Sequence, residues 1–387
     1  MLKIFCVGVT AIALLTGCAS VPPVPPPETI FRDALFAPGS QSIDARDLFA
    51  LTPAMQDYLD RQVRPQLRSR GQRQGLIDAL YSRDHLKLEY DASMTRNAAE
   101  AFEARSGNCL SLMIMTAAFA KQLDMPVRFQ SVFIDEAWSR SGDLVFLSGH
   151  VNLSLETSLR DSHGGLSNND SLMVDFIPAE MLRGVRTRVI DEATVVAMFM
   201  NNRAAENLHA GQVSEAYWWV REALRQDPKF TTAYNTLGVI YRRHGQLAAA
   251  EAALRHVLAR EPDNAQALSN LVLVLREQDR WPESNLLAAR LLALQPTPPF
   301  KYFDEGIAAM KKGEFKTAKR LFDKEIARSA YFHEFYFWLA LAHYGLGEPL
   351  EARRAMAQAV ENSTTRRDRD IYAAKLDWLK TQRPTRQ

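Results

Sequence analysis

The chain has 387 residues, 47% of them hydrophobic, which is enough for two compact domains with sizeable cores. Its 47 basic and 45 acidic residues leave a formal net charge of +2. This balance, without a basic stripe interleaved with aromatic residues, argues against nucleic acid as a partner.

The first residues have the composition of an export signal. Lys3 precedes an apolar run over residues 4–15 that is too short to span a bilayer. The run ends in Leu-Thr-Gly-Cys at 15–18, which resembles the bacterial lipobox. The resemblance implies a signal peptide over 1–17 and acylation of Cys18 as the mature N-terminus. An ordinary signal peptide and an uncleaved anchor are the alternatives.

The residues after Cys18 predict an anchored spacer. Ala19 stands where an aspartate usually retains lipoproteins at the inner membrane, so the resemblance implies an outer-membrane anchor facing the periplasm. Residues 21–28 include five prolines, which favour extended polyproline II. We therefore assign residues 18–40 to a lipid-anchored, Pro-rich spacer at the bacterial cell envelope.

The chain contains three cysteines. Cys6 leaves with the signal and Cys18 takes the lipid, so Cys109 is the only thiol expected in the mature chain. No intramolecular disulfide can then form. Because a lone thiol is liable to oxidation outside the cytoplasm, Cys109 either packs as a small hydrophobic residue or has a function.

The residues around Cys109 predict the start of a helix. A helical stretch over 45–68 comes first and is expected to pack against the core. Gly107 and Asn108 suit a turn and a helix cap, which places Cys109 in the first turn of an apolar helix that continues to Leu123. Because the N-terminal end of a helix carries partial positive charge, it favours thiolate over thiol.

Two strands are expected further along the chain. Residues 143–155 alternate in polarity and predict a strand with His150 on its polar side. A polar loop over 156–170 follows, and residues 171–177 predict a second strand that carries Asp175. If these strands pair as a hairpin, His150 and Asp175 lie side by side.

A cysteine on a helix, followed by a histidine and an aspartate on two strands, resembles the transglutaminase-like superfamily over about residues 90–190. The sequence Gly-Asn-Cys-Leu-Ser-Leu at 107–112 is similar to the nucleophile motif of bacterial transglutaminase-core proteins. The resemblance implies that Cys109 is the nucleophile, His150 the general base and Asp175 the group that orients the imidazole. It also implies a transglutaminase-like domain over 41–192, without a cofactor or metal.

Other interpretations of these residues stay open. The first is that Cys109, which lies among apolar neighbours, only packs in the core. His163, in the loop between the strands, is an alternative base. A metal site built from the cysteine, the histidine and the aspartate rests only on ligand chemistry.

The second half of the chain is repetitive, because related residues recur every 34 positions. The clearest unit, residues 231–264, resembles the tetratricopeptide repeat. About five units over 193–366 are expected to stack and bury a continuous core, with a capping helix and tail over 367–387. The repeating positions are Ala216, Ala250, Ser284, Ala318 and Ala352, and, at the turns, Gly211, Gly245, Asp279, Gly313 and Gly347.

The fold class predicted from these patterns is an α+β transglutaminase/papain-like core domain followed by an all-α tetratricopeptide-repeat solenoid. The predicted function is acyl transfer, in which Cys109 attacks an amide carbonyl and forms a thioester that water or an amine resolves. The repeats are expected to bind a protein or peptide. One alternative is an inactive scaffold that assembles envelope proteins through its repeats; another is a regulator that senses peptidoglycan fragments or oxidation through Cys109.

Overall fold

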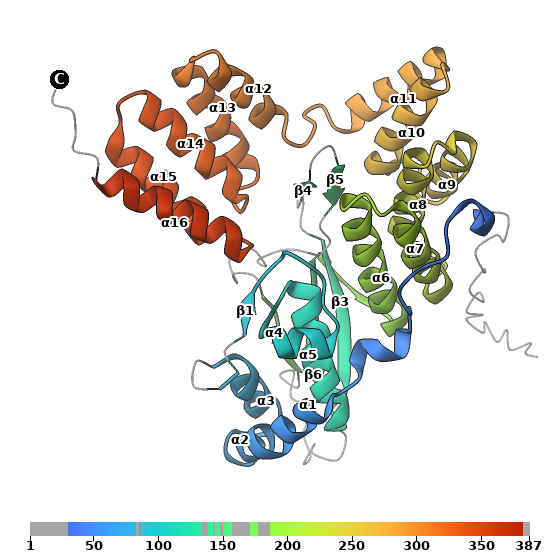
Figure 1. Cartoon of the computed structure of the whole chain (residues 1–387), viewed down its shortest axis with the longest axis vertical. Coiled ribbons are helices and arrows are strands. Elements are labelled where there is room, and N and C mark those ends of the chain that lie inside the picture. Colours follow the sequence, from blue (N-terminus) through green and yellow to red (C-terminus); the bar gives the residue numbers. More distant parts are fainter. Residues whose placement is uncertain are drawn as a thin grey trace, which may run out of the picture.

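The computed structural model describes residues 30–82, 85–86, 88–133, 138–141, 144–147, 150–156, 171–176 and 186–381. An α/β domain is followed by an array of helical hairpins (Figure 1). The predicted signal peptide, Cys18, His163 and the last residues of the tail lie outside the described residues.

The α/β domain begins with helices that pack against its core. Short 3₁₀ helices cover Asp33–Leu35 and Ala45–Phe49. The single stretch expected over 45–68 is divided, since Thr52 accepts a hydrogen bond from the Met55 amide and starts a new helix. This part contains α1 (Pro53–Tyr58), a π-helical turn (Leu59–Val63), α2 (Arg64–Arg70) and α3 (Gln72–Tyr81).

Helix α5 (Cys109–Gln122) is the central helix of the domain. It starts at Cys109 as predicted, and its residues from 110 to 120 are all buried. Before it come β1 (Glu89–Tyr90), α4 (Ala98–Ala104) and β2 (Ser106–Gly107), with β1 and β2 paired in parallel. Because the helix is buried around its whole circumference, its neighbours fix its position, and with it the position of Cys109.

Helix α5 packs against a four-stranded antiparallel sheet of order β7-β6-β3-β8. Its strands are β3 (Val127–Phe133), β6 (His150–Glu156), β7 (Ser171–Val174) and β8 (Arg186–Ile190). The predicted pairing of β6 with β7 is confirmed, with Leu153 opposite Val174. Both faces of β6 are buried, because His150, Asn152 and Ser154 are covered as well as the apolar residues between them.

Two strand predictions need correction. The residues expected to form one strand over 143–155 are divided between two sheets, because β6 pairs with β3 from His150 onward. The preceding residues instead form β5 (Leu144–Leu147), which pairs with β4 (Trp138–Ser141) in a separate hairpin. Asp175 lies one residue beyond the end of β7 rather than within a strand.

The array consists of five hairpins, formed by α6 with α7, α8 with α9, α10 with α11, α12 with α13 and α14 with α15, and a last helix, α16, packs on α15. The bounds are α6 (Glu192–His209), α7 (Val213–Gln226), α8 (Thr231–Arg243), α9 (Leu247–Arg260), α10 (Ala265–Glu277), α11 (Trp281–Leu294), α12 (Lys301–Lys311), α13 (Phe315–Arg328), α14 (His333–Gly345), α15 (Pro349–Glu361) and α16 (Arg366–Thr381).

The repeating residues occupy equivalent places in each hairpin. All five small residues of the ladder, from Ala216 to Ala352, are completely buried. The four turn glycines have φ between 73° and 77°, a left-handed conformation that only glycine adopts without strain. Asp279, which replaces the glycine of the third hairpin, has φ 59°. The turn geometry is therefore kept even where the glycine is lost.

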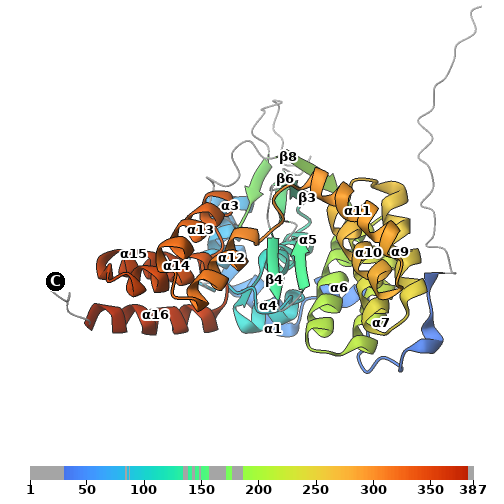
Figure 2. The ribbon, with the colours of Figure 1, turned by 90° about the horizontal axis from the view of Figure 1, so that it is seen from above.

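The array does not bury one continuous core, contrary to expectation. One hydrophobic core joins the α/β domain to the first three hairpins, and another begins at Phe300 and continues through α16. Pro296, Pro298 and Pro299 lie between α11 and α12, where proline cannot continue a helix. The two halves lie on opposite sides of the α/β domain, with β4 and β5 between them (Figure 2).

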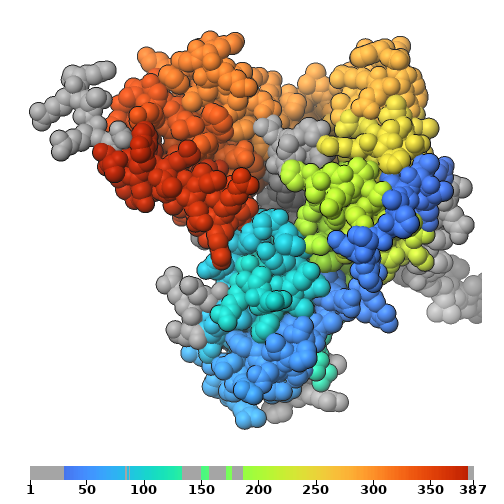
Figure 3. All heavy atoms as spheres, viewed as in Figure 1, coloured from blue at the N-terminus to red at the C-terminus, as the bar shows by residue number. Residues whose placement is uncertain are grey.

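Part of the predicted spacer packs on the array. The Phe36 ring stacks on the Tyr217 ring with centroids 3.9 Å apart, and the Tyr241 hydroxyl donates to the Ile30 carbonyl over 2.6 Å. The segment 30–40 lies along the first hairpins (Figure 3). Residues 30–40 of the predicted spacer are therefore part of the fold. Among the described residues, no helix is long and apolar enough to cross a membrane.

Candidate active site

Cys109 occupies the first position of helix α5, directly after its cap residue. The Asn108 side-chain oxygen accepts hydrogen bonds from the Ser111 amide and hydroxyl, each over 2.9 Å. A Cβ atom at Gly107 would lie 2.6 Å from the Ser111 Cβ, so only glycine fits there. These contacts fix the cap, and the amides of the first turn point out of the helix end beside Cys109 without intrahelical partners.

His150 and Asp175 form a short hydrogen-bonded pair. His150 Nε2 and Asp175 Oδ1 are 2.6 Å apart, and the two side chains are only 6% and 8% exposed. Asp175 also accepts hydrogen bonds from Asn152 Nδ2 over 2.8 Å and from the Phe176 amide over 2.7 Å. These contacts hold the carboxylate toward His150, which leaves Nδ1 as the ring nitrogen available to Cys109.

The electrostatics link the three residues that the sequence singled out. Burial alone lowers the pKa of His150, but hydrogen bonds with Asp175 and Cys109, together with their charges, outweigh burial and raise it to about 9. The imidazole therefore keeps its proton at neutral pH. A protonated histidine between two acidic groups is suited to stabilise a thiolate and to deliver a proton.

Three further residues belong to the surroundings of the site, and the sequence did not single them out. Asn152 holds Asp175, and its only signal was its position two residues after His150 on the same side of the strand. Tyr90 lies opposite Gly107, and burial and the nearby Cys109 raise the pKa of its phenol. Thr95 accepts a hydrogen bond from Asn108 Nδ2 over 2.9 Å, a contact that no sequence pattern indicates.

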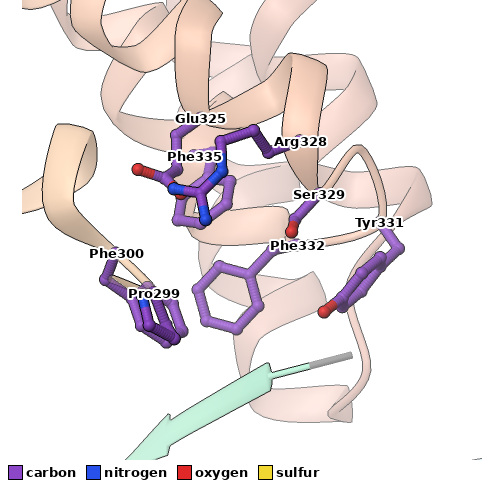
Figure 4. Close-up of a pocket in the computed structure, with 8 residues that line it drawn as sticks. All are labelled: Pro299, Phe300, Glu325, Arg328, Ser329, Tyr331, Phe332 and Phe335. Atoms are coloured by element: carbon purple, nitrogen blue, oxygen red, sulfur yellow. The ribbon is translucent and has the colours of Figure 1, made fainter. Parts of the chain in front are cut away.

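A pocket lies elsewhere, beside the break in the array (Figure 4). It has about 220 Å³ of space, including open solvent. The charged side chains that line it bind the backbone of the array. Glu325 accepts a hydrogen bond from the Tyr302 amide over 2.8 Å, and Arg328 donates to the Thr297 carbonyl over 3.1 Å. We assign it no role in chemistry. The pocket is lined by Pro299, Phe300, Glu325, Arg328, Ser329, Tyr331, Phe332 and Phe335.

The alternative of a metal site lacks a geometric basis. Across the part of the chain that the structure describes, which includes Cys109, His150 and Asp175, no three His, Cys, Asp or Glu side chains are arranged to hold a metal ion. The contacts of His150 and Asp175 are instead those of a hydrogen-bonded pair.

Comparison with known proteins identifies the repeats. A family model described as tetratricopeptide repeat matches residues 207–272, and a second with the same description matches 303–366. The matched stretches lie on either side of the break between α11 and α12. The second half of the chain therefore carries tetratricopeptide repeats that form a helical solenoid, and such repeats commonly provide a surface for protein partners.

Individual relatives match the same part of the chain. The "TPR repeat-containing protein PA4667" of Pseudomonas aeruginosa is 30% identical over 126 residues, which is 32% of this chain and 21% of the relative. This chain thus matches about a fifth of that protein. The crystal structure of MamA protein aligns at 22% identity with a TM-score of 0.26, over 45% of this chain and 93% of that chain. The protein TTC0263 of Thermus thermophilus aligns at 16% identity with a TM-score of 0.30, over 47% and 99%.

The pKa of His150 provides a direct test of the site. We expect a titration midpoint near 9 in NMR spectra of the imidazole, and a clearly lower one in Asp175→Asn, because the amide removes the negative charge beside Nε2. Since the folded pKa is raised above the ordinary 6.5, the contribution of His150 to the free energy of unfolding is full below that pH and is lost as pH rises through about 9. An unchanged midpoint in the variant would mean that Asp175 does not set the charge of His150.

Proposed function

We propose that this protein is an envelope lipoprotein that transfers acyl groups through Cys109. The observation that supports the proposal most strongly is the buried pair of His150 and Asp175, 2.6 Å apart, with Cys109 at the first position of a helix and in hydrogen-bond contact with His150. A histidine held by a carboxylate and a thiol at a helix N-terminus are the two components that cysteine acyl transfer needs.

The contacts suggest a role for each group. Asp175 accepts from Nε2, which fixes the ring so that Nδ1 serves Cys109. The Cys109 sulfur attacks an amide carbonyl, and the C–N bond breaks as His150 delivers its proton to the leaving amine. A thioester remains on Cys109. The Cys109 backbone amide, at the open end of α5, supplies one hydrogen bond to the oxyanion.

The second half of the reaction returns the site to its starting state. His150, now neutral, takes a proton from water or from an amine as it attacks the thioester carbonyl. The C–S bond breaks and the thiolate leaves, paired again with the imidazolium. Water gives an amidase or peptidase, and an amine gives a crosslinking enzyme.

The arrangement of the α/β domain supports a transglutaminase-like core. The cysteine lies at the start of helix α5, the histidine on strand β6 and the aspartate directly after strand β7, in the order that the resemblance implies. The helix packs against the antiparallel sheet that carries the histidine. In this proposal the repeats bind a protein or peptide, and the α/β domain carries the residues that react with it.

The envelope location is part of the same proposal. Cys18 would carry the lipid, and the chain between it and Ile30 would connect the fold to the membrane. Because the segment from Ile30 onward lies along α7 and α8, the anchor would leave the fold beside the first hairpins. This position would place those hairpins nearest to the membrane surface.

The reactivity of Cys109 tests the acyl-transfer proposal. We expect iodoacetamide to label Cys109 in the folded protein at pH 7, and at least about tenfold more slowly in His150→Ala, because an unassisted thiol is ionised to only a few per cent. The rate is measured by mass spectrometry of the peptide that contains residue 109. Cys109→Ala gives the background.

Two results would contradict the proposal. If the folded protein resists alkylation, or if His150→Ala reacts as fast as the wild type, Cys109 is a packing residue. The scaffold alternative, in which the repeats alone act, would then stand. A matched control is His209→Ala, which changes an array histidine at the end of α6 and is expected to leave the rate unchanged.

The lipid anchor is tested by mass spectrometry of the protein from membranes. We expect a mature chain that begins at Cys18 and carries acyl chains, and a Cys18→Ser variant that is released from the outer membrane because its anchor is lost. Detection of unmodified Cys18, or of a disulfide between Cys18 and Cys109, would contradict the anchor and the lone-thiol argument together.

A further inference from the structure

The segment of residues 89–96 connects the start of helix α5 with both halves of the array. Glu89 and Tyr90 form strand β1, which lies beside β2 just before Cys109. The Ala92 amide donates to the Thr364 carbonyl over 2.8 Å, where the chain enters α16. Figure 1 shows the N-terminal end of α16 beside this part of the α/β domain. The segment is therefore held from the C-terminal half of the array.

Helix α6, the first helix of the array, holds the other end of the segment. The Thr95 amide donates to Glu206 Oε1 over 2.6 Å, and Arg203 Nη1 donates to the Thr95 carbonyl over 3.3 Å. Both backbone polar groups of Thr95, which is 1% exposed, are thus bound by side chains of α6. Arg203 and Glu206 also form an ion pair over 3.6 Å.

Thr95 in turn contacts the cap of α5. Its hydroxyl accepts a hydrogen bond from Asn108 Nδ2 over 2.9 Å, and Asn108 is the cap residue directly before Cys109. The next residue, Arg96, donates its amide to the Ser111 hydroxyl over 2.7 Å. A continuous series of hydrogen bonds therefore runs from Glu206 through Thr95 to the cap that places the cysteine.

We infer that Glu206 is a positioning residue for the Cys109 nucleophile, so that the first repeat of the array forms part of the acyl-transfer unit. Without Glu206 the Thr95 amide loses its acceptor, and Asn108 loses a fixed partner. The cap of α5 then moves relative to His150, and small displacements of a reacting group cost large factors in rate. The inference rests on the proposed function, since it concerns the same cysteine.

The test compares three variants of the full chain by the rate of iodoacetamide labelling at Cys109. Glu206→Ala is expected to slow labelling at least about tenfold. Glu206→Gln, which keeps an oxygen acceptor for the Thr95 amide, is expected to restore the rate to within about twofold of wild type. Thr95→Val is expected to behave like Glu206→Ala, because it removes only the hydroxyl that holds Asn108.

Asp227→Ala is the matched control. Asp227 is also a partly buried carboxylate of the first hairpin, and it accepts hydrogen bonds from Thr194 Oγ1 over 2.7 Å and from the Lys229 amide over 2.9 Å. It holds the other end of α6, so its loss lowers the thermal midpoint without moving Thr95. We expect its labelling rate to equal that of wild type.

The outcomes separate this inference from the proposed function. A wild-type protein whose Cys109 does not react contradicts the proposed function. A reactive wild type with an equally reactive Glu206→Ala variant overturns the positioning role alone. So does a loss of rate in Asp227→Ala as large as in Glu206→Ala at similar thermal midpoints, since the effect would then reflect general destabilisation of the first repeat.

Discussion

Asn108 closes the N-terminal end of helix α5 by binding the Ser111 amide, and the position of Cys109 depends on this cap. A helix end that faces its neighbours needs a side chain to bind its free amides, and asparagine does this well. Gly107 allows the close approach of Ser111 that the cap needs. Because α5 is buried along most of its length, the cap has little freedom to shift, and Cys109 keeps a fixed position relative to the sheet.

The array and the α/β domain are less separate than a linear description of two domains implies. One hydrophobic core runs from the N-terminal helices through α5 to the first three hairpins, while the last two hairpins have their own core. The division falls between α11 and α12, in a connection that contains three prolines. The C-terminal half nevertheless returns to the α/β domain through Thr364, next to the segment that leads to the cap. Each half of the array therefore contacts the segment 89–96, which leads to the start of α5.

Local signals in the sequence predicted much of this structure. The features that depend on contacts between distant residues were not predicted. The 34-residue spacing predicted the hairpins because each repeat packs a small residue at the same place, and the Gly-Asn pair predicted the start of α5 because caps are local. The single strand expected over 143–155 was wrong because the partner of each part is set by long-range pairing, β4 for β5 and β3 for β6. The division of the core was missed because the prolines were taken only as the ends of units. Thr95 and Glu206 are 111 positions apart, and no local pattern indicates such a contact.

The most direct test of the central claim is the capture of a thioester on Cys109. The protein would be mixed with an activated peptide ester and quenched in acid within seconds, and its intact and peptide masses would then be measured. Acyl transfer through Cys109 predicts one added acyl group on the peptide that contains residue 109, removed by hydroxylamine and absent in Cys109→Ala. A protein that is never acylated at Cys109, or whose acyl group lies equally on other residues, would contradict this claim.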